Sequence, residues 1–463
     1  MLLSGFKHLP AEKLDNLHAI HVSGTKGKGS TCAFSESILR HNGHTTGLYT
    51  SPHLVEVRER IRINGKPLTR EAFADRFFEV WDQLQQQQTT DLGMPSYFHF
   101  LTILAFHTFL AEKVDVAIIE CGVGGSFDST NVLAKPWVCA VSPLGLDHTQ
   151  TLGDTMQLIA RHKAGIFKPR VPAVSIFQSD ETAALTLQAY AKHVKAVYSI
   201  ANPLHEYTSE SEPLLTLGLE GTHQQQNAAL ALAATGLWLR RHRGESELTG
   251  GSRYGERINP YTFREPQAFI SQQTLKGLRD ATFPGRSMTY RSQGVTYYLD
   301  GAHTLESMQC AAEWMRSLDT PVNSKRYLLF NCMKRDPVEL LKPVLDLHRK
   351  LAFDGVLFCP NITYHTKQHA DTTNHNQHTE NQLAASKLNA SIWTDLCNQA
   401  QVLTSSTHGK VRSFESIEQA VRWVHSPEAS GACPGTHTED VRVFVCGSLH
   451  LVGGVLANVG YGQ

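Results

Sequence analysis

Short apolar runs alternate with longer segments of helical periodicity along this chain. The pattern is clearest at the start, where an apolar run at residues 18–22 predicts a strand and a glycine-rich turn follows at 23–29. A helix is expected from that turn to about His41, with Gly43 ending it. Such alternation is typical of a parallel sheet covered by helices on both faces, so the sequence predicts an α/β fold.

The alternation runs in two series that are separated by a break near Phe283-Pro-Gly-Arg286. We therefore predict a larger N-terminal domain of P-loop type with a parallel sheet, residues 1–285, and a smaller C-terminal Rossmann-like α/β domain, residues 286–463. The first series predicts further strands at 45–50, 114–120, 137–141 and 171–177 and amphipathic helices at 70–85 and 98–113. The second predicts strands at 296–300, 326–330, 355–359 and 441–445 and helices at 305–318 and 337–350.

Two segments depart from this pattern. Residues 240–264 are rich in Arg, Gly, Ser and Glu without periodicity, which indicates a surface excursion. From residue 361 to about 407 the chain is rich in His, Asn, Gln and Thr, so we expect a mobile polar insert near 361–381 and a helical stretch near 382–403. A metal-binding module around His365 to His378 is the alternative, but no HxxxH-type spacing with supporting acids favours it.

Composition excludes several classes of protein. The 463 residues include 43 basic and 43 acidic side chains, so no net field attracts nucleic acid. No apolar run reaches the roughly 18 residues of a membrane span, and none of the nine cysteines forms a CxxC pair. The first twenty residues mix acids and bases, unlike a targeting segment, so we expect a cytoplasmic protein; an alternative upstream start would supply a mitochondrial form.

The sharpest chemical signal is the segment Ser23-Gly-Thr-Lys-Gly-Lys-Gly-Ser30 between the first strand and the first helix. Small residues there let backbone N–H groups approach phosphate oxygens, and the helix N-terminus adds partial positive charge. The segment departs from GxxxxGK[ST], because Val22 takes the leading glycine position and Gly29 follows Lys28 directly. A glycine-rich turn that happens to hold lysines is the alternative. In this context we predict ATP binding by Gly24, Thr25, Lys26, Gly27, Lys28, Gly29 and Ser30.

A magnesium triphosphate needs hard oxygen ligands near that loop. Glu120 ends the apolar run at 116–119 and precedes the flexible Gly122–Gly125 segment. It is either a metal ligand at the carboxyl edge of the sheet or a solvated strand end. His148 follows another strand and on its own is more often structural, and Ser51 is individually unremarkable.

Ordered blocks along most of the chain resemble the folylpolyglutamate synthases of the Mur-ligase superfamily, in their eukaryotic form. In the first domain these blocks are His21–Phe34, Ser51-Pro-His-Leu54, Val57–Gly65, Glu120–Gly125, Asp128 with Thr130-Asn131, Leu146–Thr149, Leu152–Asp154, Lys163–Lys168, and His223 with Asn227–Ala229. In the second they are Pro284-Gly-Arg286, Leu299–Thr304 and Gly447–Gly454.

The resemblance implies ATP-dependent addition of L-glutamate, in γ-linkage, to tetrahydrofolate (poly)glutamates, with release of ADP and phosphate. A carboxylate does not acylate an amine at neutral pH, because its leaving group would be oxide. Transfer of the γ-phosphoryl group of ATP to the carboxylate gives an acyl phosphate that the amine of glutamate attacks. The resemblance also implies Mg²⁺ and a monovalent cation such as K⁺. We expect a monomer.

Carried over by resemblance, Ser51, Glu120 and His148 become Mg²⁺ ligands, and Lys28 and His303 approach the transferring phosphoryl group. Lys163 corresponds to the lysine that is carbamylated in related ligases, and an ion-pairing lysine is the alternative.

Three further residues resemble nucleotide contacts, namely Asn227, Arg286 and Asp300. Their alternatives are a helix-start asparagine, a surface charge and, for Asp300 to His303, a plain strand-ending turn. The segment 51–65 corresponds to the family's folate loop; its Arg58, Arg60 and Arg62 either hold an anionic substrate or form a solvated strand face.

One departure from the family pattern bears on function. Where the family usually has Thr-Gly-Asp-Arg-Asp, this chain has Cys332-Met-Lys-Arg-Asp336, which puts the local loop shape and the affinity for glutamate in doubt. Two alternatives therefore stay open. One is the same chemistry on another acceptor, as in a dihydrofolate synthase or a cell-wall ligase; the other is an ATP-binding homologue that has lost catalysis.

Overall fold

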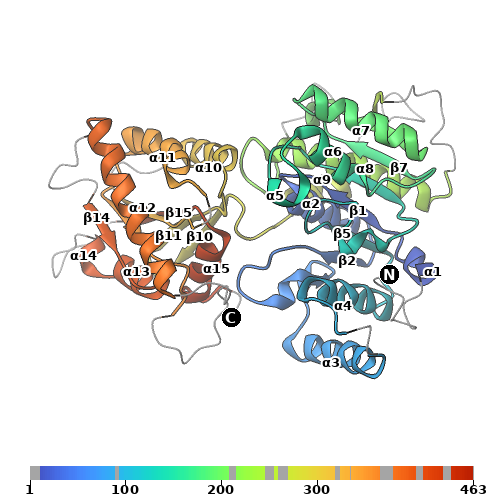
Figure 1. Cartoon of the computed structure of the whole chain (residues 1–463), viewed down its shortest axis with the longest axis horizontal. Coiled ribbons are helices and arrows are strands. Elements are labelled where there is room, and N and C mark those ends of the chain that lie inside the picture. Colours follow the sequence, from blue (N-terminus) through green and yellow to red (C-terminus); the bar gives the residue numbers. More distant parts are fainter. Residues whose placement is uncertain are drawn as a thin grey trace. The chain divides into compact units, whose positions relative to one another are not determined.

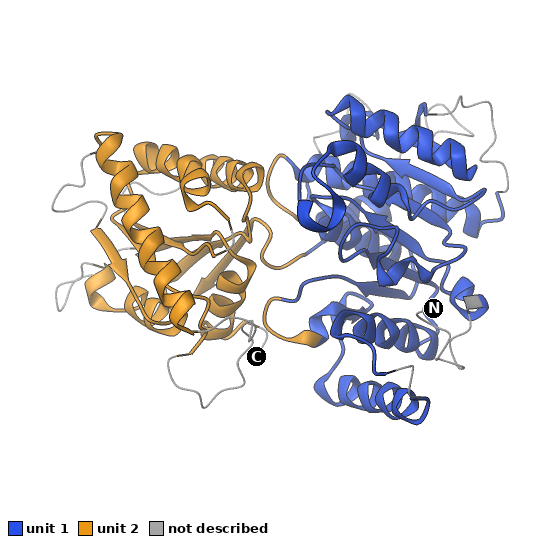
Figure 2. Cartoon of the chain, viewed as in Figure 1, with its two compact units in different colours: residues 1–53, 58–218, 223–282 blue, residues 54–57, 219–222, 283–463 orange. Residues whose placement is uncertain are grey.

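The chain forms two compact units in a computed structural model (Figure 2). Unit 1 comprises residues 1–53, 58–218 and 223–282, and unit 2 comprises residues 54–57, 219–222 and 283–463. The chain thus leaves unit 1 for two short excursions before it enters unit 2 for good. The structure describes residues 11–88, 93–207, 215–245, 255–258, 270–318, 324–333, 335–364, 379–402, 410–430 and 440–461.

Among its described residues, unit 1 is built on a nine-stranded sheet in the order β4-β3-β2-β5-β1-β6-β7-β8-β9 (Figure 1). All neighbours from β2 to β9 pair in parallel, and β3 and β4 add an antiparallel edge. The central strand β1 is buried at all four positions, as expected for a parallel strand covered on both faces. The strands are β1 Ile20–Ser23, β2 Thr46–Tyr49, β3 Ile61–Ile63, β4 Lys66–Pro67, β5 Val116–Glu120, β6 Val138–Val141, β7 Pro172–Ser175, β8 Val197–Ala201 and β9 Arg257–Ile258.

Helices pack on both faces of this sheet. Helix α2 packs against α8 and α9, and α6 packs against α7. The carboxyl ends of β1, β5 and β6 are neighbours at one edge, which is where ligands bind in open α/β sheets. The helices are α1 Ala11–Leu14, α2 Lys28–His41, α3 Arg70–Gln86, α4 Tyr97–Ala111, α5 Thr149–Leu152, α6 Met156–Ala164, α7 Glu181–Val194, α8 Gln224–His242 and α9 Gln272–Arg279.

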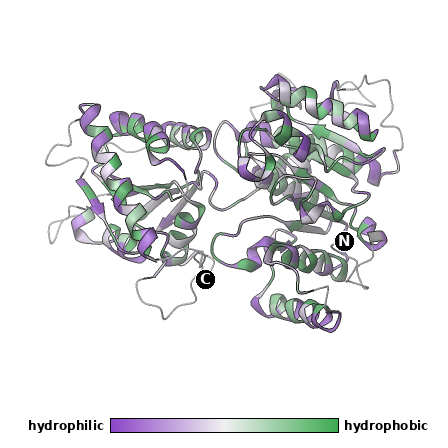
Figure 3. Cartoon of the chain, in the orientation of Figure 1, coloured by the Kyte–Doolittle hydropathy of each residue, from purple (hydrophilic) through white to green (hydrophobic). Residues whose placement is uncertain are grey.

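Unit 2 has a second sheet, with six strands in its described part in the order β10-β11-β15-β12-β13-β14. Only β10 is antiparallel to its neighbour. Helices α10, α11 and α12 bury apolar side chains against one face, and α13 and α15 against the other, so hydrophobic residues gather on the strands (Figure 3). The elements are β10 Met288–Ser292, β11 Val295–Leu299, α10 Leu305–Ser317, β12 Lys325–Phe330, α11 Pro337–Leu351, β13 Gly355–Phe358, α12 Thr379–Gln399, β14 Lys410–Ser413, α13 Ile417–Val424, α14 Pro427–Ser430, β15 Val441–Cys446 and α15 Leu449–Asn458.

The predicted α/β class is confirmed, and every strand predicted from the sequence is present within a few residues of its expected limits. The sequence analysis did not predict β3, β4, β8, β9, β10 or β14. Strands β10 and β14 lie at sheet edges, and their exposed and half-buried residues form no apolar run that would mark a strand.

A helix is present where one was predicted at 98–113, as α4, but the prediction that it is amphipathic is wrong. Helix α4 is buried continuously from Phe100 to Phe106, which leaves it no polar face over almost two turns. The hydroxyl groups of Thr102 and Thr108 donate to the carbonyls of Phe98 and Leu104, so these polar residues are satisfied within the helix. No helix in the described ranges combines the length and apolar character needed to cross a membrane.

The two polar segments are described only in part. Residues 365–378 lie outside the described residues, and the histidines from 365 to 378 with them. At both ends of the segment 361–381 the prediction of a mobile insert is wrong, because Thr363 is fully buried and its carbonyl accepts the N–H of Glu418, and residues 379–381 belong to α12. Helix α12 starts at Thr379 and ends at Gln399, earlier at both ends than expected. In the excursion at 240–264, α8 continues to His242 and β9 occupies residues 257–258.

Candidate active site

The phosphate-binding candidate lies where β1 ends and α2 begins. Gly27 stands immediately before the helix, and no side chain caps the helix. The N–H groups of the first turn, from Lys28 to Ser30, therefore lack the usual capping partner and are available to an anion. Gly27 has a φ of +78°, and a Cβ atom there would lie 2.0 Å from Oδ1 of Asn227. Only glycine fits at this position.

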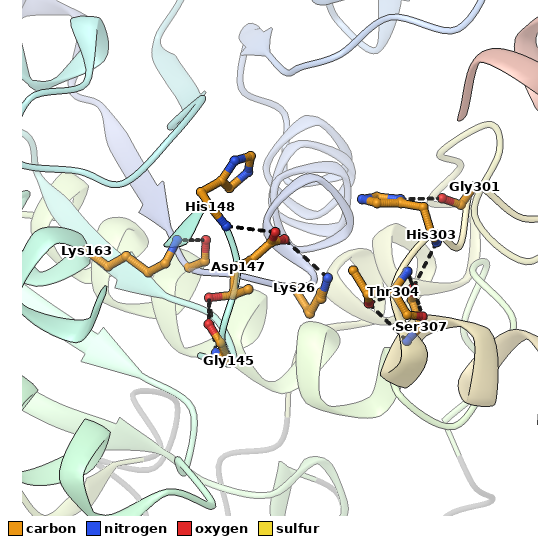
Figure 4. Close-up of polar contacts among 11 residues, drawn as sticks. Lys26, Gly145, Asp147, His148, Lys163, Gly301, His303, Thr304 and Ser307 are labelled. Carbon is orange, nitrogen blue, oxygen red and sulfur yellow. Dashed lines mark hydrogen bonds and ion pairs between the residues drawn. The ribbon is translucent and has the colours of Figure 1, made fainter. Parts of the chain in front are cut away.

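The first half of the same loop is tied to the segment that follows β6. The backbone N–H groups of Thr25 and Lys26 donate to the carbonyl of Pro143, at 3.0 and 3.1 Å. The Thr25 hydroxyl also donates to the carbonyl of Gly145 at 3.1 Å (Figure 4). The N–H groups of Thr25 and Lys26 are therefore already bonded and are not available to a phosphate.

Asp147 connects the loop to the carboxyl end of β6. Its Oδ2 lies 3.4 Å from Nζ of Lys26, and its Oδ1 accepts the N–H of His148 at 2.9 Å (Figure 4). Asp147 is buried. The sequence analysis did not single it out, although its place between Leu146 and His148 in a matching block was a usable signal. Lys26 is therefore held by a carboxylate, whereas Lys28 opens the helix itself.

Two of the three expected metal ligands are brought together. Glu120 is 4% exposed, which rules out the solvated strand end, and its Oε2 accepts the N–H of Ser51 at 2.8 Å. His148 has a φ of 52° and stands directly before α5. Within the described ranges no group of three or more His, Cys, Asp and Glu side chains is arranged to hold a metal, but the expected set contains only two such residues and a serine.

Lys163 lies near the end of α6 with 2% of its surface exposed. Its Nζ donates to the carbonyl of Gly24 at 2.7 Å (Figure 4). Burial, and then the positive charge of Lys28, lower the pKa of Lys163 to about 7. The lowered pKa favours the uncharged form of this amine, which is the form that reacts with carbon dioxide.

Asn227 lies within α8 rather than at its start, since His223 precedes the helix. The helix-start alternative is therefore wrong. Its Nδ2 donates to Oε1 of Gln224 at 2.9 Å, and its amide packs on Gly27. This buried amide limits the space at Gly27 of the phosphate loop, and its contact with the nucleotide stays a prediction.

The sequence-predicted residues of unit 2 surround a turn after β11. Both carboxylate oxygens of Asp300 accept backbone N–H groups, Oδ2 from Ser287 at 2.7 Å and Oδ1 from Ala302 at 2.8 Å. Because Ser287 follows Arg286 in the chain, Asp300 fixes the backbone beside that arginine. Nδ1 of His303 lies 2.8 Å from the carbonyl of Gly301 (Figure 4). That carbonyl can only accept, so Nδ1 of His303 donates to it.

Each arginine of the segment 51–65 has a hydrogen-bond partner within ten residues of it in the sequence. Nε of Arg60 donates to Nδ1 of His53 at 2.9 Å, and Arg60 is buried rather than part of a solvated face. Arg58 donates to the carbonyl of Leu68, and Arg62 to that of Glu59. Contact with a substrate by any of the three stays a prediction.

The segment 332–336, which departs from the family pattern, makes local structural contacts through its described residues. Cys332 is buried, and its thiol lies 3.5 Å from the carbonyl of Arg335. Asp336 caps α11 by accepting the N–H of Val338 at 2.9 Å. Lys334 lies outside the described residues.

With this geometry in place, similarity to known proteins defines the class. Residues 22–235 match the Mur ligase middle domain family. A solved folylpolyglutamate synthase from Mycobacterium tuberculosis, complexed with ADP and AMPPCP, superposes with a TM-score of 0.68 at 22% identity, covering 98% of this chain and 95% of that one. E. coli FolC in complex with DHPP and ADP gives 0.66 at 21% identity, covering 99% and 96%. The two-unit fold is therefore the Mur-ligase fold.

The mitochondrial folylpolyglutamate synthases of Bos taurus and Homo sapiens are 39% and 40% identical to this chain, over 507 and 506 residues. Each match covers 97% of this chain and 84% of the relative. The folylpolyglutamate synthase of Candida albicans is 37% identical over 96% of this chain and 85% of its own. The chain belongs to the folylpolyglutamate synthase family.

Proposed function

We propose that this protein is an ATP-dependent ligase that adds L-glutamate in γ-linkage to tetrahydrofolate (poly)glutamates. The observation that carries the proposal is the carboxyl edge of the unit 1 sheet. That edge carries three groups of unit 1: the uncapped start of α2 with Lys28, the buried carboxylate of Glu120 and the buried amine of Lys163. The chain that carries them belongs to the folylpolyglutamate synthase family. These residues are the parts that phosphoryl transfer needs.

The reaction is an activation followed by an amide-forming displacement. A γ-carboxylate oxygen of the folate bonds to the γ-phosphorus of ATP and ADP leaves, which gives an acyl phosphate. The glutamate amine then bonds to the acyl carbon, phosphate leaves, and the amine loses its proton. Lys28 and the first-turn N–H groups of α2 stabilise the negative charge of the moving phosphoryl group. Asn227, Arg286 and Asp300 are proposed to hold the nucleotide, and His303 to approach the phosphoryl group.

Mg²⁺ is proposed to be held by Ser51, Glu120 and His148, and it would neutralise phosphate charge. The donor set is compatible with Mg²⁺, which prefers oxygen ligands, because the buried Glu120 carboxylate accepts the backbone N–H of Ser51 and residue 51 therefore lies beside it. K⁺ is proposed from family resemblance. Carbamylation of Lys163 is supported by its lowered pKa and would turn a buried cation into a carboxylate.

The test is ATP-dependent incorporation of labelled L-glutamate into tetrahydrofolate with Mg²⁺ and K⁺, following ADP and product length together. We expect one ADP for each glutamate added and a ladder of longer folates. Pteroate and a muramyl peptide are offered in parallel as acceptors. Turnover with either of those alone, or ATP binding by folded protein without any ladder, would refute the proposal.

The same proposal extends to the setting of the enzyme. We expect a monomer, which size-exclusion chromatography with light scattering would check. Cytoplasmic and mitochondrial forms are both proposed, the latter supported by the mitochondrial relatives. Fractionation of cells that produce the protein would show each compartment, and absence from both would contradict the assignment.

A further inference from the structure

The glycine-rich segment after Glu120 is docked on the end of α6, backbone against backbone. The N–H of Ser126 donates to the carbonyl of His162 at 2.8 Å. A Cβ atom at Gly125 would lie 2.6 Å from that same carbonyl, and one at Gly165 would lie 2.0 Å from Oγ of Ser126. Neither segment has room to shift against the other while this contact holds.

Asn131 ties the two segments together. Its Nδ2 donates to the carbonyls of Ser126 and Gly165, both at 3.1 Å, so each amide proton holds one segment. Its Oδ1 accepts from Nζ of Lys168 at 2.9 Å. Burial lowers the pKa of Lys168, and the hydrogen bond to Asn131 offsets part of the cost of burying its amine. The same bond fixes the orientation of the amide, because only its oxygen can accept from the lysine.

Ser23 joins the phosphate loop to the same junction. Its Oγ lies 3.1 Å from the carbonyl of Gly124 and 3.1 Å from the carbonyl of Lys163. Ser23 is fully buried. Three segments therefore meet here, namely the start of the phosphate loop, the segment that follows Glu120, and the end of the helix that carries Lys163.

We propose that Asn131 and Lys168 are positioning residues of the ligase reaction. By clamping the end of α6 to the segment 121–126, they set the position of the Lys163 amine relative to the Glu120 carboxylate and the phosphate loop. Neither residue needs to touch substrate. The inference rests on the proposed function, and it adds two residues that the site as described above does not use.

The activity test compares Asn131→Ala and Lys168→Met with the wild type. We expect kcat to fall about 10- to 100-fold, because small misplacements of reacting groups are costly. KM for ATP and for folate should change less than about threefold, because the binding surfaces stay in place. The double variant should be no worse than Asn131→Ala, since Lys168 acts through the amide. Lys168→Arg, which keeps a donor, should recover part of the loss.

Asn42→Ala is the matched control. The Nδ2 of Asn42 also donates twice, to the carbonyl of Ile38 at 2.8 Å and to Oγ1 of Thr274 at 3.1 Å, but at the far end of α2. It should lose a similar amount of stability and keep its kcat. A wild-type kcat in Asn131→Ala, or equal losses of kcat in both variants, would overturn the inference.

Hydrogen exchange separates this inference from the proposed function. The amides of Ser126 and Gly165 both donate to the carbonyl of His162, so in Asn131→Ala they should lose protection together, and in Asn42→Ala they should not. A wild type that makes no ladder would refute the ligase, and the exchange result would still decide the clamp. Unchanged protection of Ser126 and Gly165 would refute the clamp in an active enzyme.

Discussion

Burial of the Lys163 amine makes the free energy of unfolding depend on pH. In carbon-dioxide-free buffer, where the amine is not carbamylated, the pKa of Lys163 is lowered to about 7 in the folded protein, against its ordinary value of 10.5 in the unfolded chain. Between these values the unfolded chain binds more protons, so the free energy of unfolding should rise as pH rises from about 7 to 10.5. Urea unfolding of the wild type and of Lys163→Met across this window should show a steeper rise for the wild type. Lys192→Met, at an exposed lysine, is the control and should match the wild-type slope.

His21 is expected to lower the stability of the folded protein at acidic pH. It is fully buried, Nε2 lies 2.8 Å from Oγ1 of Thr130, and burial lowers its pKa to about 3. As pH falls from 6.5 towards 3 the unfolded chain is protonated first, so the folded state loses stability. His21→Gln should lose less melting temperature than the wild type between pH 7 and pH 4. Parallel losses in the two proteins would show that His21 is not responsible.

At the scale of single residues, the sequence indicated those candidate site residues whose signal is local. The phosphate loop and Glu120 stand out because glycines or an apolar strand flank them. Asp147, Asn131 and Lys168 stand in sequence blocks that match the family, but only the structure shows what each of them contacts. Asn131 donates to the backbone carbonyls of Ser126 and Gly165, and a sequence pattern does not show which backbone carbonyl a side chain contacts.

The two ends of helix α2 provide a test at the scale of an element. Gly27 before the helix and Gly43 after it both have positive φ, +78° and +90°. A Cβ atom at Gly27 would meet Asn227, whereas at Gly43 nothing lies within 4 Å. Both alanine variants should lose about 1–2 kcal/mol from the left-handed backbone. Only Gly27→Ala should also lose ATP binding, by more than about tenfold, since displacement of the loop disturbs the phosphate donors.

Isothermal titration with ATP and thermal melting of both variants would check this pair. Equal ATP affinity in Gly27→Ala and Gly43→Ala would show that the loop tolerates a side chain. It would then count against the phosphate-binding role of the turn.

Among the elements, buried strands were predictable and edge strands were not. Strand β5 reads as an uninterrupted apolar run because both its faces are covered, whereas β14 has three exposed positions out of four. Helix α4 shows the converse limit. An amphipathic helix was predicted there, but Thr102 and Thr108 donate their hydroxyls to backbone carbonyls of the helix itself, which periodicity alone does not reveal.

At the scale of the whole molecule, unit 2 depends on two short segments that belong to the first half of the chain. Leu54 and Val55 pack on its core, and Nε1 of Trp314 donates to Oε2 of Glu220 at 2.7 Å. A fragment of residues 283–463 lacks both. We expect calorimetry to show a lower melting temperature for this fragment than for the same unit in the full chain. Addition of a peptide spanning residues 50–60 should recover part of the difference, and identical melting temperatures would contradict the dependence.

The close seating of Leu54 on α15 also limits how this protein can exchange parts with its relatives. The carbonyl of Leu54 occupies the space that a Cβ atom on Gly453 would need, at 2.0 Å. A chimera with a single crossover at residue 283 would combine a foreign α15 with a native Leu54 and a foreign Trp314 with a native Glu220. Functional chimeras should therefore arise when residues 54–57, 219–222 and 283–463 all come from the same parent. These three separate stretches of the gene must then be exchanged together.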